Sequence, residues 1–378
     1  MTINELREKT RNCQVIYILL IYFLIAKRYM HLIYNNILYK ENPIVRTTVF
    51  LFGLFLALNL IVSKVTKSDI ILSMFGGLTF ILCKEQLLLI YIIMAISAKN
   101  IDNDKIIKYY IGFNLLFLLI VVIGNTIGII PDTTDLHYRI INGVQKIRHD
   151  FGFGNPNAMF FYLMPIYTGY IYIRYEKYNW IDRILLWSVA IFVCVTTYSR
   201  TGFAVIMLGL IMVEIFKQID ILKINFIKIL FTNIPLILIL VSLFIGFVFA
   251  TSPKLNSLLS ARPEYWNKYL SGMSIFGSSK SSSMFYTYPL DNSYVYLLSL
   301  YGILVTIFFV LITNFSLNKF IEQKDYKFVI IATMFFLYGF GEDILFSTSL
   351  NFTLILMLKN IDLQDVYRFY KCKLNFIN

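Results

Sequence analysis

Long apolar runs, separated by short polar segments rich in Lys and Arg, extend through almost the whole chain. A helix that crosses a bilayer needs about 20 mostly apolar residues, so these runs predict about twelve spans. What remains is too short for a separate soluble domain, and residues 1–378 are expected to form a single multi-pass membrane domain of the all-α class. The predicted spans are residues 13–34, 44–63, 69–83, 86–98, 109–130, 157–173, 184–198, 201–216, 229–250, 291–313, 328–341 and 343–358.

Composition supports this class and excludes several others. The chain is 58% hydrophobic and 15% charged, with a mean hydropathy of +0.69, whereas a soluble domain carries about 25% charged residues. These values exclude a disordered protein, a nucleic-acid-binding protein and a disulfide-stapled secreted fold. The four cysteines are scattered without CxxC spacing, so the sequence predicts neither a metal site nor a disulfide framework.

The net charge of +12 is first of all a topology signal. Most of the 34 Lys and Arg residues fall in segments that face the cytoplasm if the N-terminus is inside. Because cations beside a span resist translocation, the bias predicts that both termini are cytoplasmic. Two longer loops, about 131–156 and 251–290, then face outward.

Four arginines oppose this bias at the predicted outer face. Arg139 and Arg148 lie in the first long loop, Arg200 lies in the tight turn 198–202, and Arg262 lies in the second long loop. The planar fork of Arg binds phosphate or carboxylate bidentately. The four arginines therefore suggest an anionic ligand at the outer face, and the alternative for each is snorkelling at the interface.

The first long loop ends in RHDFGFGNPN, residues 148–157. Its glycines permit backbone conformations that side chains forbid, and Pro156 with Asn157 reads as the start of the next helix. Backbone N–H groups, Arg148 and His149 could face a phosphate there, with His149 as a general base. An ordinary loop-to-helix entry is the alternative.

The second long loop contains ARPEYW (261–266), a Ser-rich stretch and DNSYVYLLSLYG (291–302). Tyr265, Trp266 and Tyr294 could stack on sugar rings, or they could belong to the aromatic belt of the interface. Asp291 and Asn292 could cap a helix. Alternatively, Asp291 could bind or activate a hydroxyl group, with Asn292 as a substrate-binding residue.

These motifs, in this order with SRTG (199–202) and Phe276-Gly277, resemble the Wzy-type polysaccharide polymerases of the O-antigen ligase/polymerase superfamily. The likeness covers residues 109–313. It implies a metal-independent glycosyltransferase of the bacterial cytoplasmic membrane, without a cofactor. This enzyme would join undecaprenyl-diphosphate-linked oligosaccharide repeat units at the outer face of that membrane and release undecaprenyl diphosphate. A flippase and a chain-length regulator would be its neighbours in capsule or O-antigen synthesis.

The resemblance also implies roles for individual residues. Arg148, Arg200 and Arg262 would grip the donor diphosphate, and His149 or Asp291 would orient or deprotonate the acceptor hydroxyl. Asn155 and Asn157 would shape the loop or contact substrate.

Three alternatives stay open. A twelve-span chain also fits a lipid-linked oligosaccharide flippase or another secondary transporter, although such proteins usually contain broken helices and midplane charges. The ligase branch of the superfamily uses a His in its second long loop, and residues 251–290 contain none. A metal-dependent lipid-sugar glycosyltransferase would need outer acidic pairs. The outer pair Glu342-Asp343 is isolated and is interpreted as structural.

Overall fold

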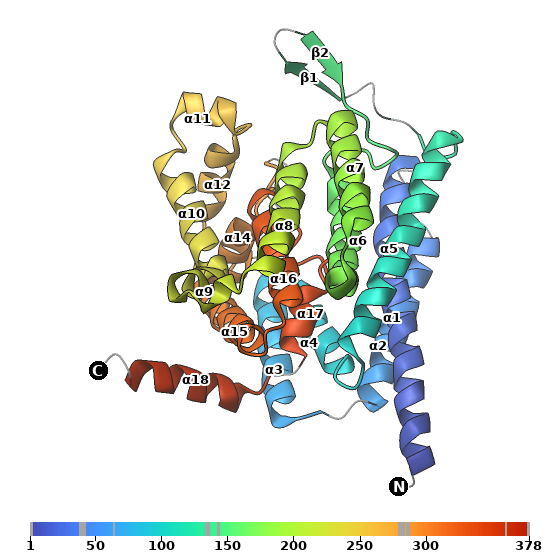
Figure 1. Cartoon of the computed structure of the whole chain (residues 1–378), viewed down its shortest axis with the longest axis vertical. Helices are drawn as coiled ribbons and strands as arrows, with labels where there is room; N and C mark the ends of the chain where they lie inside the picture. Colours follow the sequence, from blue (N-terminus) through green and yellow to red (C-terminus); the bar gives the residue numbers. More distant parts are fainter. Residues whose placement is uncertain are drawn as a thin grey trace. The chain divides into compact units, whose positions relative to one another are not determined.

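The structure is a computed structural model that is helical apart from one β-hairpin and connecting loops (Figure 1). The chain packs as two compact units, Met1–Ser63 with Asn100–Glu214, and Lys64–Lys99 with Ile215–Asn378. The structure describes residues 3–37, 43–62, 65–131, 133, 137–141, 144–278, 284, 288–359 and 361–375.

The first unit consists of long helices that pack side by side, with a hairpin between the third and fourth. In it α1 packs on α2 and α5, α5 on α6, and α6 on α7. Its elements are α1 (Ile3–Ile37), α2 (Pro43–Val62), α5 (Asn103–Thr126), β1 (Tyr138–Ile141), β2 (Val144–Ile147), α6 (Ala158–Arg174), α7 (Trp180–Thr197) and α8 (Arg200–Gln218), which ends beyond the unit.

A buried carboxylate fixes the turn between α6 and α7. Asp182 accepts hydrogen bonds from the Tyr170 hydroxyl at 2.6 Å and from the Arg174 guanidinium at 3.2 Å. It also accepts from the backbone N–H of Asn179, whose side chain caps α7 in return. This reciprocal capping box sets where α7 begins, and the ion pair holds α6 against it.

The second unit has more helices, and several of them are short. Its α4 packs on α3 and α17, and its α10 packs on α12 and α16. Its elements are α3 (Lys67–Cys83), α4 (Leu87–Ser97), α9 (Asn225–Thr232), α10 (Ile234–Val248), α11 (Pro253–Leu258), α12 (Arg262–Leu270), α14 (Ser293–Tyr296), a π-helical turn (Leu297–Tyr301), α15 (Gly302–Glu322), α16 (Tyr326–Gly341), α17 (Thr353–Leu358) and α18 (Leu363–Asn375).

Several long apolar helices indicate a multi-pass membrane protein, as the apolar runs predict. Among the described residues five helical stretches have the length and composition of a membrane span, or six if the bent pair α9–α10 counts as one. Their surfaces carry exposed large apolar side chains such as Val195 and Ile307, which suit contact with lipid. The five are Gln14–Ile33, Asn103–Thr126, Trp180–Thr197, Arg200–Gln218 and Ser293–Glu322.

The stretch Ser293–Glu322 is interrupted at Gly302. After the π-helical turn, Gly302 has φ +85° and ψ 177°, a region that almost only glycine occupies. The loop 274–278 pairs with the backbone groups that the break releases. Ser278 N donates to Leu300 O at 3.0 Å, and Ile303 N donates to Ser274 O at 3.1 Å. A neighbouring loop therefore replaces the hydrogen bonds that a continuous helix would supply.

A second interruption is the 66° bend between α9 and α10. Asn314 of α15 lies against it. Its side-chain amide donates to Thr232 O at 3.2 Å and to the side chain of Asn233 at 2.8 Å. One asparagine thus satisfies acceptors exposed by the bend.

The helix predicted over 343–358 forms only over Thr353–Leu358. Residues 342–352 are instead a buried irregular segment, in which side chains supply the missing hydrogen bonds. The Tyr91 hydroxyl lies 3.0 Å from the carbonyl oxygens of both Leu345 and Asn351. Ser293 Oγ donates to Glu342 O and accepts from Leu345 N at 3.1 Å. Because these partners lie far away along the chain, local hydropathy cannot reveal them.

We expect Gly302→Ala to destabilise the protein by at least about 1–3 kcal/mol. A Cβ at this position would lie 2.2 Å from Gly277 N, in addition to the strained backbone. Thermal unfolding of purified protein in detergent measures the effect. Gly77→Ala in α3 is the control, because its Cβ meets no atom within 4 Å and Ala favours a helix over Gly. Equal stability of the two variants would contradict the assignment.

Candidate functional site

In the first unit, the hairpin leads directly into the loop 148–157. The strands β1 and β2 pair antiparallel, with Tyr138 opposite Ile147. Arg148 N donates to His137 O, and His137 Nε2 lies 3.1 Å from Gly154 O. The base of the hairpin is thereby fixed to the glycine-rich loop. Arg139 lies in β1, but its side chain is outside the described part of the structure.

Asp150 organises the glycine-rich loop from inside. It is fully buried, and its carboxylate accepts from Gly152 N at 3.1 Å and from the Thr133 hydroxyl. Gly152 has φ +83°, and a Cβ there would lie 2.8 Å from Asn125 Cβ. The glycine therefore lets the loop turn tightly against α5. Asp150 is not among the residues predicted from the sequence, although a carboxylate before two glycines is a signal for such a turn.

Two hydrogen bonds fix Arg148 to the ends of α7 and α6. Its Nε donates to Thr197 O at 2.8 Å, at the end of α7, and its Nη2 donates to Asn157 Oδ1 at 2.7 Å, beside the start of α6. His149 N donates to Thr196 O, while the His149 side chain is exposed. Asn155 Oδ1 accepts from Asn157 N at 2.9 Å. The loop thus brings Arg148, Asn155 and Asn157 together.

Arg200 follows the turn to which Arg148 is hydrogen-bonded through Thr197 O. It is the first residue of α8, three residues after Thr197, and it is exposed. A cation at a helix N-terminus is electrostatically unfavourable, whereas an anion there is favourable. Gly202 of the same motif allows close packing, since a Cβ would lie 2.3 Å from Phe160 Cβ of α6. The turn therefore presents two arginines and a helix N-terminus to one region of the surface of this unit.

In the second unit, Arg262 is bound by acidic partners. Its Nη2 lies 3.3 Å from Asp291 Oδ2, 3.9 Å from Glu342 Oε1 and 3.1 Å from Gly341 O. The guanidinium stands at the C-terminus of α16, and Asp291 lies just before the N-terminus of α14. Both positions agree with the helix dipoles. One cation faces two carboxylates, so the formal charge of these three groups is negative.

Glu342, which the sequence pattern leads us to interpret as structural, lies in this cluster beside Arg262. Its side chain is 12% exposed, against 42% for Asp291. The backbone carbonyl of Glu342 also accepts from Ser293 Oγ. Glu342 thereby connects the Arg262 cluster to the buried irregular segment. No local pattern shows this, because 80 residues separate it from Arg262 in the sequence.

Three other predicted substrate-binding residues lie in the interior of the second unit. Asn292 caps α14 by accepting from Tyr294 N, and its amide donates to Ser242 and to Phe340 O. The Tyr294 hydroxyl donates to Phe336 O at 2.8 Å. Trp266 is 3% exposed and packs on Phe340. In this structure the three support the fold around Asp291.

Tyr265 remains near the surface, beside Tyr288 and Lys268. The two tyrosine rings are 5.7 Å apart, and Lys268 Nζ lies 4.0 Å from the centre of the Tyr288 ring. The Glu264 carboxylate raises the pKa of Lys268 through their 2.9 Å ion pair. Tyr269 donates to Tyr288 O, and burial raises its pKa to about 12. The group is an ordered aromatic surface at the end of α12.

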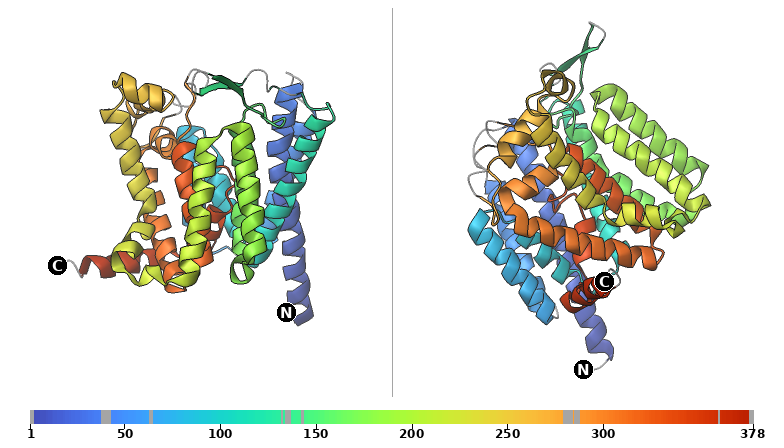
Figure 2. Two further views of the ribbon diagram at one scale, coloured as in Figure 1. Left: turned by 45° about the horizontal axis from the view of Figure 1, so that its top comes forward. Right: turned by 90° about the vertical axis from the view of Figure 1, so that its left-hand side faces the viewer.

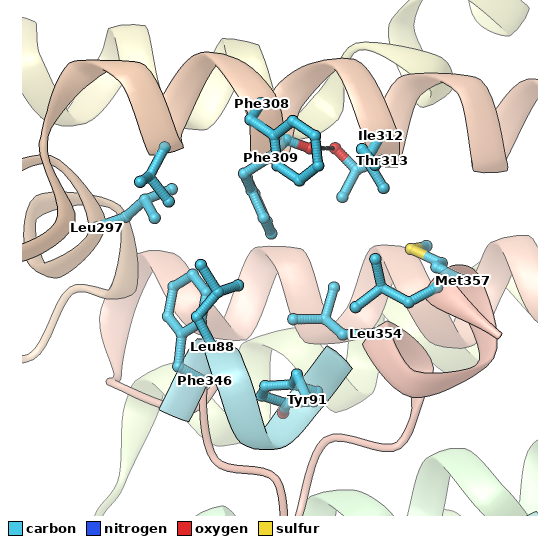
Figure 3. A pocket seen from close by; sticks show the side chains of 12 residues that line it. Leu88, Tyr91, Leu297, Phe308, Phe309, Ile312, Thr313, Phe346, Leu354 and Met357 are labelled. Carbon is cyan, nitrogen blue, oxygen red and sulfur yellow. Dashed lines mark hydrogen bonds between the residues drawn. The ribbon is translucent and has the colours of Figure 1, made fainter. Parts of the chain in front are cut away.

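An apolar cavity lies between α15, α4 and the segment 346–358 of the second unit (Figure 3). The hydroxyl of Thr313 in its wall donates to Phe309 O at 2.7 Å, and that of Tyr91 is used by the irregular segment. Such a lining offers nothing to a diphosphate or a sugar. Around it stand Leu88, Leu297, Phe309, Phe346, Leu354 and Met357.

Comparison with protein-family models, with curated proteins and with solved structures gives no match to this chain. Among the described residues no three His, Cys, Asp or Glu side chains are grouped so that they could hold a metal ion.

The Arg262 cluster makes an energetic prediction. We expect Arg262→Met and Glu342→Gln to show a coupling of about 0.5–1 kcal/mol in a double-mutant cycle on thermal stability. The partial burial of both side chains reduces solvent screening relative to a surface pair.

The exposed pair Glu264–Lys268 on α12 is the matched control, with coupling expected at or below a few tenths of a kcal/mol. Strict additivity of Arg262→Met and Glu342→Gln would show that Glu342 does not belong to the cluster.

Proposed function

We propose that this protein is a polysaccharide polymerase. It joins undecaprenyl-diphosphate-linked oligosaccharide repeat units at the outer face of the bacterial cytoplasmic membrane. The observation that carries the proposal is the turn before α8, where Arg148 donates to Thr197 O three residues before Arg200. The order of the motifs around this turn, which resembles the Wzy-type polymerases, adds the chemical identity of the anion.

The first unit binds the donor diphosphate in this proposal. Arg148 donates to the Thr197 carbonyl and to the Asn157 side chain, which hold its guanidinium at the turn. Arg200 adds a second cation at the N-terminus of α8. Cations at a helix N-terminus can stabilise the negative charge that develops on a departing diphosphate.

The acceptor hydroxyl needs a general base in this proposal. The acceptor hydroxyl oxygen forms a bond to the anomeric carbon of the donor, and the bond from that carbon to the diphosphate oxygen breaks. The electron pair of that bond leaves with undecaprenyl diphosphate, and the hydroxyl proton passes to a general base. Asp291 is one candidate base, oriented by Arg262, and His149 is the other.

The full topology is part of the same proposal. Twelve spans, with both termini in the cytoplasm, place the loop 148–157 and the Arg262 cluster on the outer side. In this scheme α9–α10 and α14–α15 each count as one interrupted span. The shorter apolar helices α2, α4 and α16 complete the set with α3, α6 and the segment ending in α17.

A lipid-linked oligosaccharide flippase is the second candidate, and one observation favours it. Transporters commonly contain interrupted helices whose ends face a substrate, and the second unit has interruptions at Asn233 and at Gly302. Loop and side-chain hydrogen bonds occupy both of them. Polymerisation therefore stays the first proposal.

The arginine turn can be tested by activity. Arg148→Ala and Arg200→Ala should each lower the rate of elongation of defined lipid-linked repeat units by about 10²–10³-fold. Each substitution removes a cation that would stabilise the leaving diphosphate. Lys146→Ala is the matched control, since Lys146 is exposed in β2 two residues before Arg148. The assay contains purified protein without ATP or metal.

Full elongation by both arginine variants would overturn the assignment of the diphosphate site. Transport of the same lipids across vesicle membranes without elongation would favour the flippase.

The sidedness can be tested separately. Cysteines introduced at Gln145 and at Ser271 should react in intact cells with a thiol reagent that does not cross the membrane, because both positions lie in the predicted outer loops. Both residues are exposed in the structure. Protection of either position until the cells are broken would place its loop in the cytoplasm and would contradict an outer active site.

A further inference from the structure

The C-terminal helix α18 runs in a different direction from the spanning helices of its unit. In Figures 1 and 2 it lies across the direction of α10, at the end of the unit opposite α11 and α12. It covers Leu363–Asn375. A helix that runs across the direction of the membrane-spanning helices lies parallel to the membrane plane.

Both the start and the middle of α18 are fixed to the rest of the unit. Asp362 accepts from Gln364 N and from Ser68 Oγ, each at 2.9 Å, which ties the helix to the first turn of α3. The Tyr370 hydroxyl donates to Leu311 O of α15 at 2.9 Å. Phe369 packs edge-on against Phe315 of α15, with ring centroids 5.5 Å apart. This orientation is therefore built into the fold.

On the side of α18 that faces away from α15, aromatic, basic and acidic residues follow one another around the helix. At 3.6 residues per turn, the order around the helix is Tyr367, Lys371, Arg368, Cys372 and Asp365. The Tyr367 side chain is 66% exposed, and Lys371 Nζ lies 5.9 Å from its ring centre. Around the helix, the order thus runs from an aromatic edge through two cations to a carboxylate edge.

This order matches the layers of a bilayer surface. An interfacial helix places aromatic rings at the acyl boundary, Lys and Arg at the headgroups and acidic groups toward water. Arg368 is 72% exposed and pairs with Asp365 at 3.8 Å, a separation typical of a weak surface pair. Lys319 of α15 is also exposed, one turn beyond Phe315 on the helix face that α18 contacts.

We propose that α18 is an interfacial helix that binds anionic phospholipid headgroups through Arg368 and Lys371. Tyr367 sits at the acyl boundary, and Cys372 faces the aqueous edge of the headgroup layer. The lipid surface itself binds this face. The face lies at the end of the spanning helices of the unit, where the bilayer surface is expected, and its positive charge is complementary to anionic lipid. This site is independent of the polymerase proposal.

The position of α18 can be measured through Cys372. It is exposed, whereas Cys83 is buried and Cys194 is half-buried, so among these three cysteines an environment-sensitive fluorescent maleimide reacts preferentially with Cys372. Labelled full-length protein is placed in nanodiscs of phosphatidylcholine, with or without phosphatidylglycerol, and quenched with acrylamide, a neutral quencher that the lipid charge does not repel. Labelled Cys372→Ser protein gives the background to subtract. We expect quenching to fall several-fold when phosphatidylglycerol is present.

Lipid selectivity is the second measurement. The ratio of phosphatidylglycerol to phosphatidylcholine retained from mixed micelles is determined by mass spectrometry. Arg368→Glu with Lys371→Glu should lower it roughly tenfold. Lys146→Glu with Lys254→Glu, which reverses two exposed cations away from α18, should retain it.

Two results would overturn the proposal. The first is acrylamide quenching that does not depend on phosphatidylglycerol, which would leave this face to a protein partner or to solvent. The second is an equal loss of lipid selectivity in both charge-reversal variants, which would assign the effect to net charge alone. The comparison of the two nanodisc compositions uses the unmodified sequence. It therefore tests the proposal even if the two charge reversals at Arg368 and Lys371 impair folding.

Discussion

Backbone groups that leave a helix inside apolar surroundings must find partners within the protein, and the second unit is organised by this requirement. The loop 274–278 completes the break at Gly302, and Asn314 completes the bend at Asn233. Tyr91 and Ser293 complete the irregular segment 342–352. Each interruption thus needs a specific polar side chain or loop from elsewhere in the chain. The Arg262 cluster stands at the end of that segment, and its geometry depends on the same hydrogen bonds.

The apolar runs predict helix positions well wherever a helix satisfies its own backbone. The run 69–83 corresponds to α3 (Lys67–Cys83), and the run 184–198 corresponds to α7 (Trp180–Thr197), which its capping box starts a few residues earlier. The prediction over 343–358 is wrong for residues 343–352. Their apolar character reflects burial, and a tyrosine about 250 residues earlier in the chain supplies the hydrogen bonds that make burial without a helix possible. The hairpin β1–β2 was missed because its exposed residues show no strong alternation.

The candidate site could be predicted only in part. An arginine that opposes a charge bias is visible in the sequence, and Arg148, Arg200 and Arg262 were found in this way. Whether such an arginine meets neutral or acidic partners depends on contacts between distant segments. Arg148 donates to Thr197 O and to the Asn157 side chain, and Arg262 lies beside the carboxylates of Asp291 and Glu342. The sequence signal therefore finds such an arginine without showing its partners. Asn292 and Tyr294 look like site residues because they follow Asp291, yet their polar atoms serve the fold.

The hydroxyl group of Tyr91 has a consequence for how this sequence can change over evolutionary time. Apolar side chains that face lipid can be exchanged for one another with little effect, because lipid makes no geometric demand on them. A tyrosine hydroxyl placed between two carbonyl oxygens has no such substitute. Phenylalanine would remove this donor from the buried Asn351 O, while Leu345 O would keep the Asn351 side-chain amide as its donor. Distant relatives of this protein would then share few residues overall. They would be recognised better by a handful of polar positions, such as 91, 293, 314 and 351, than by similarity along the chain.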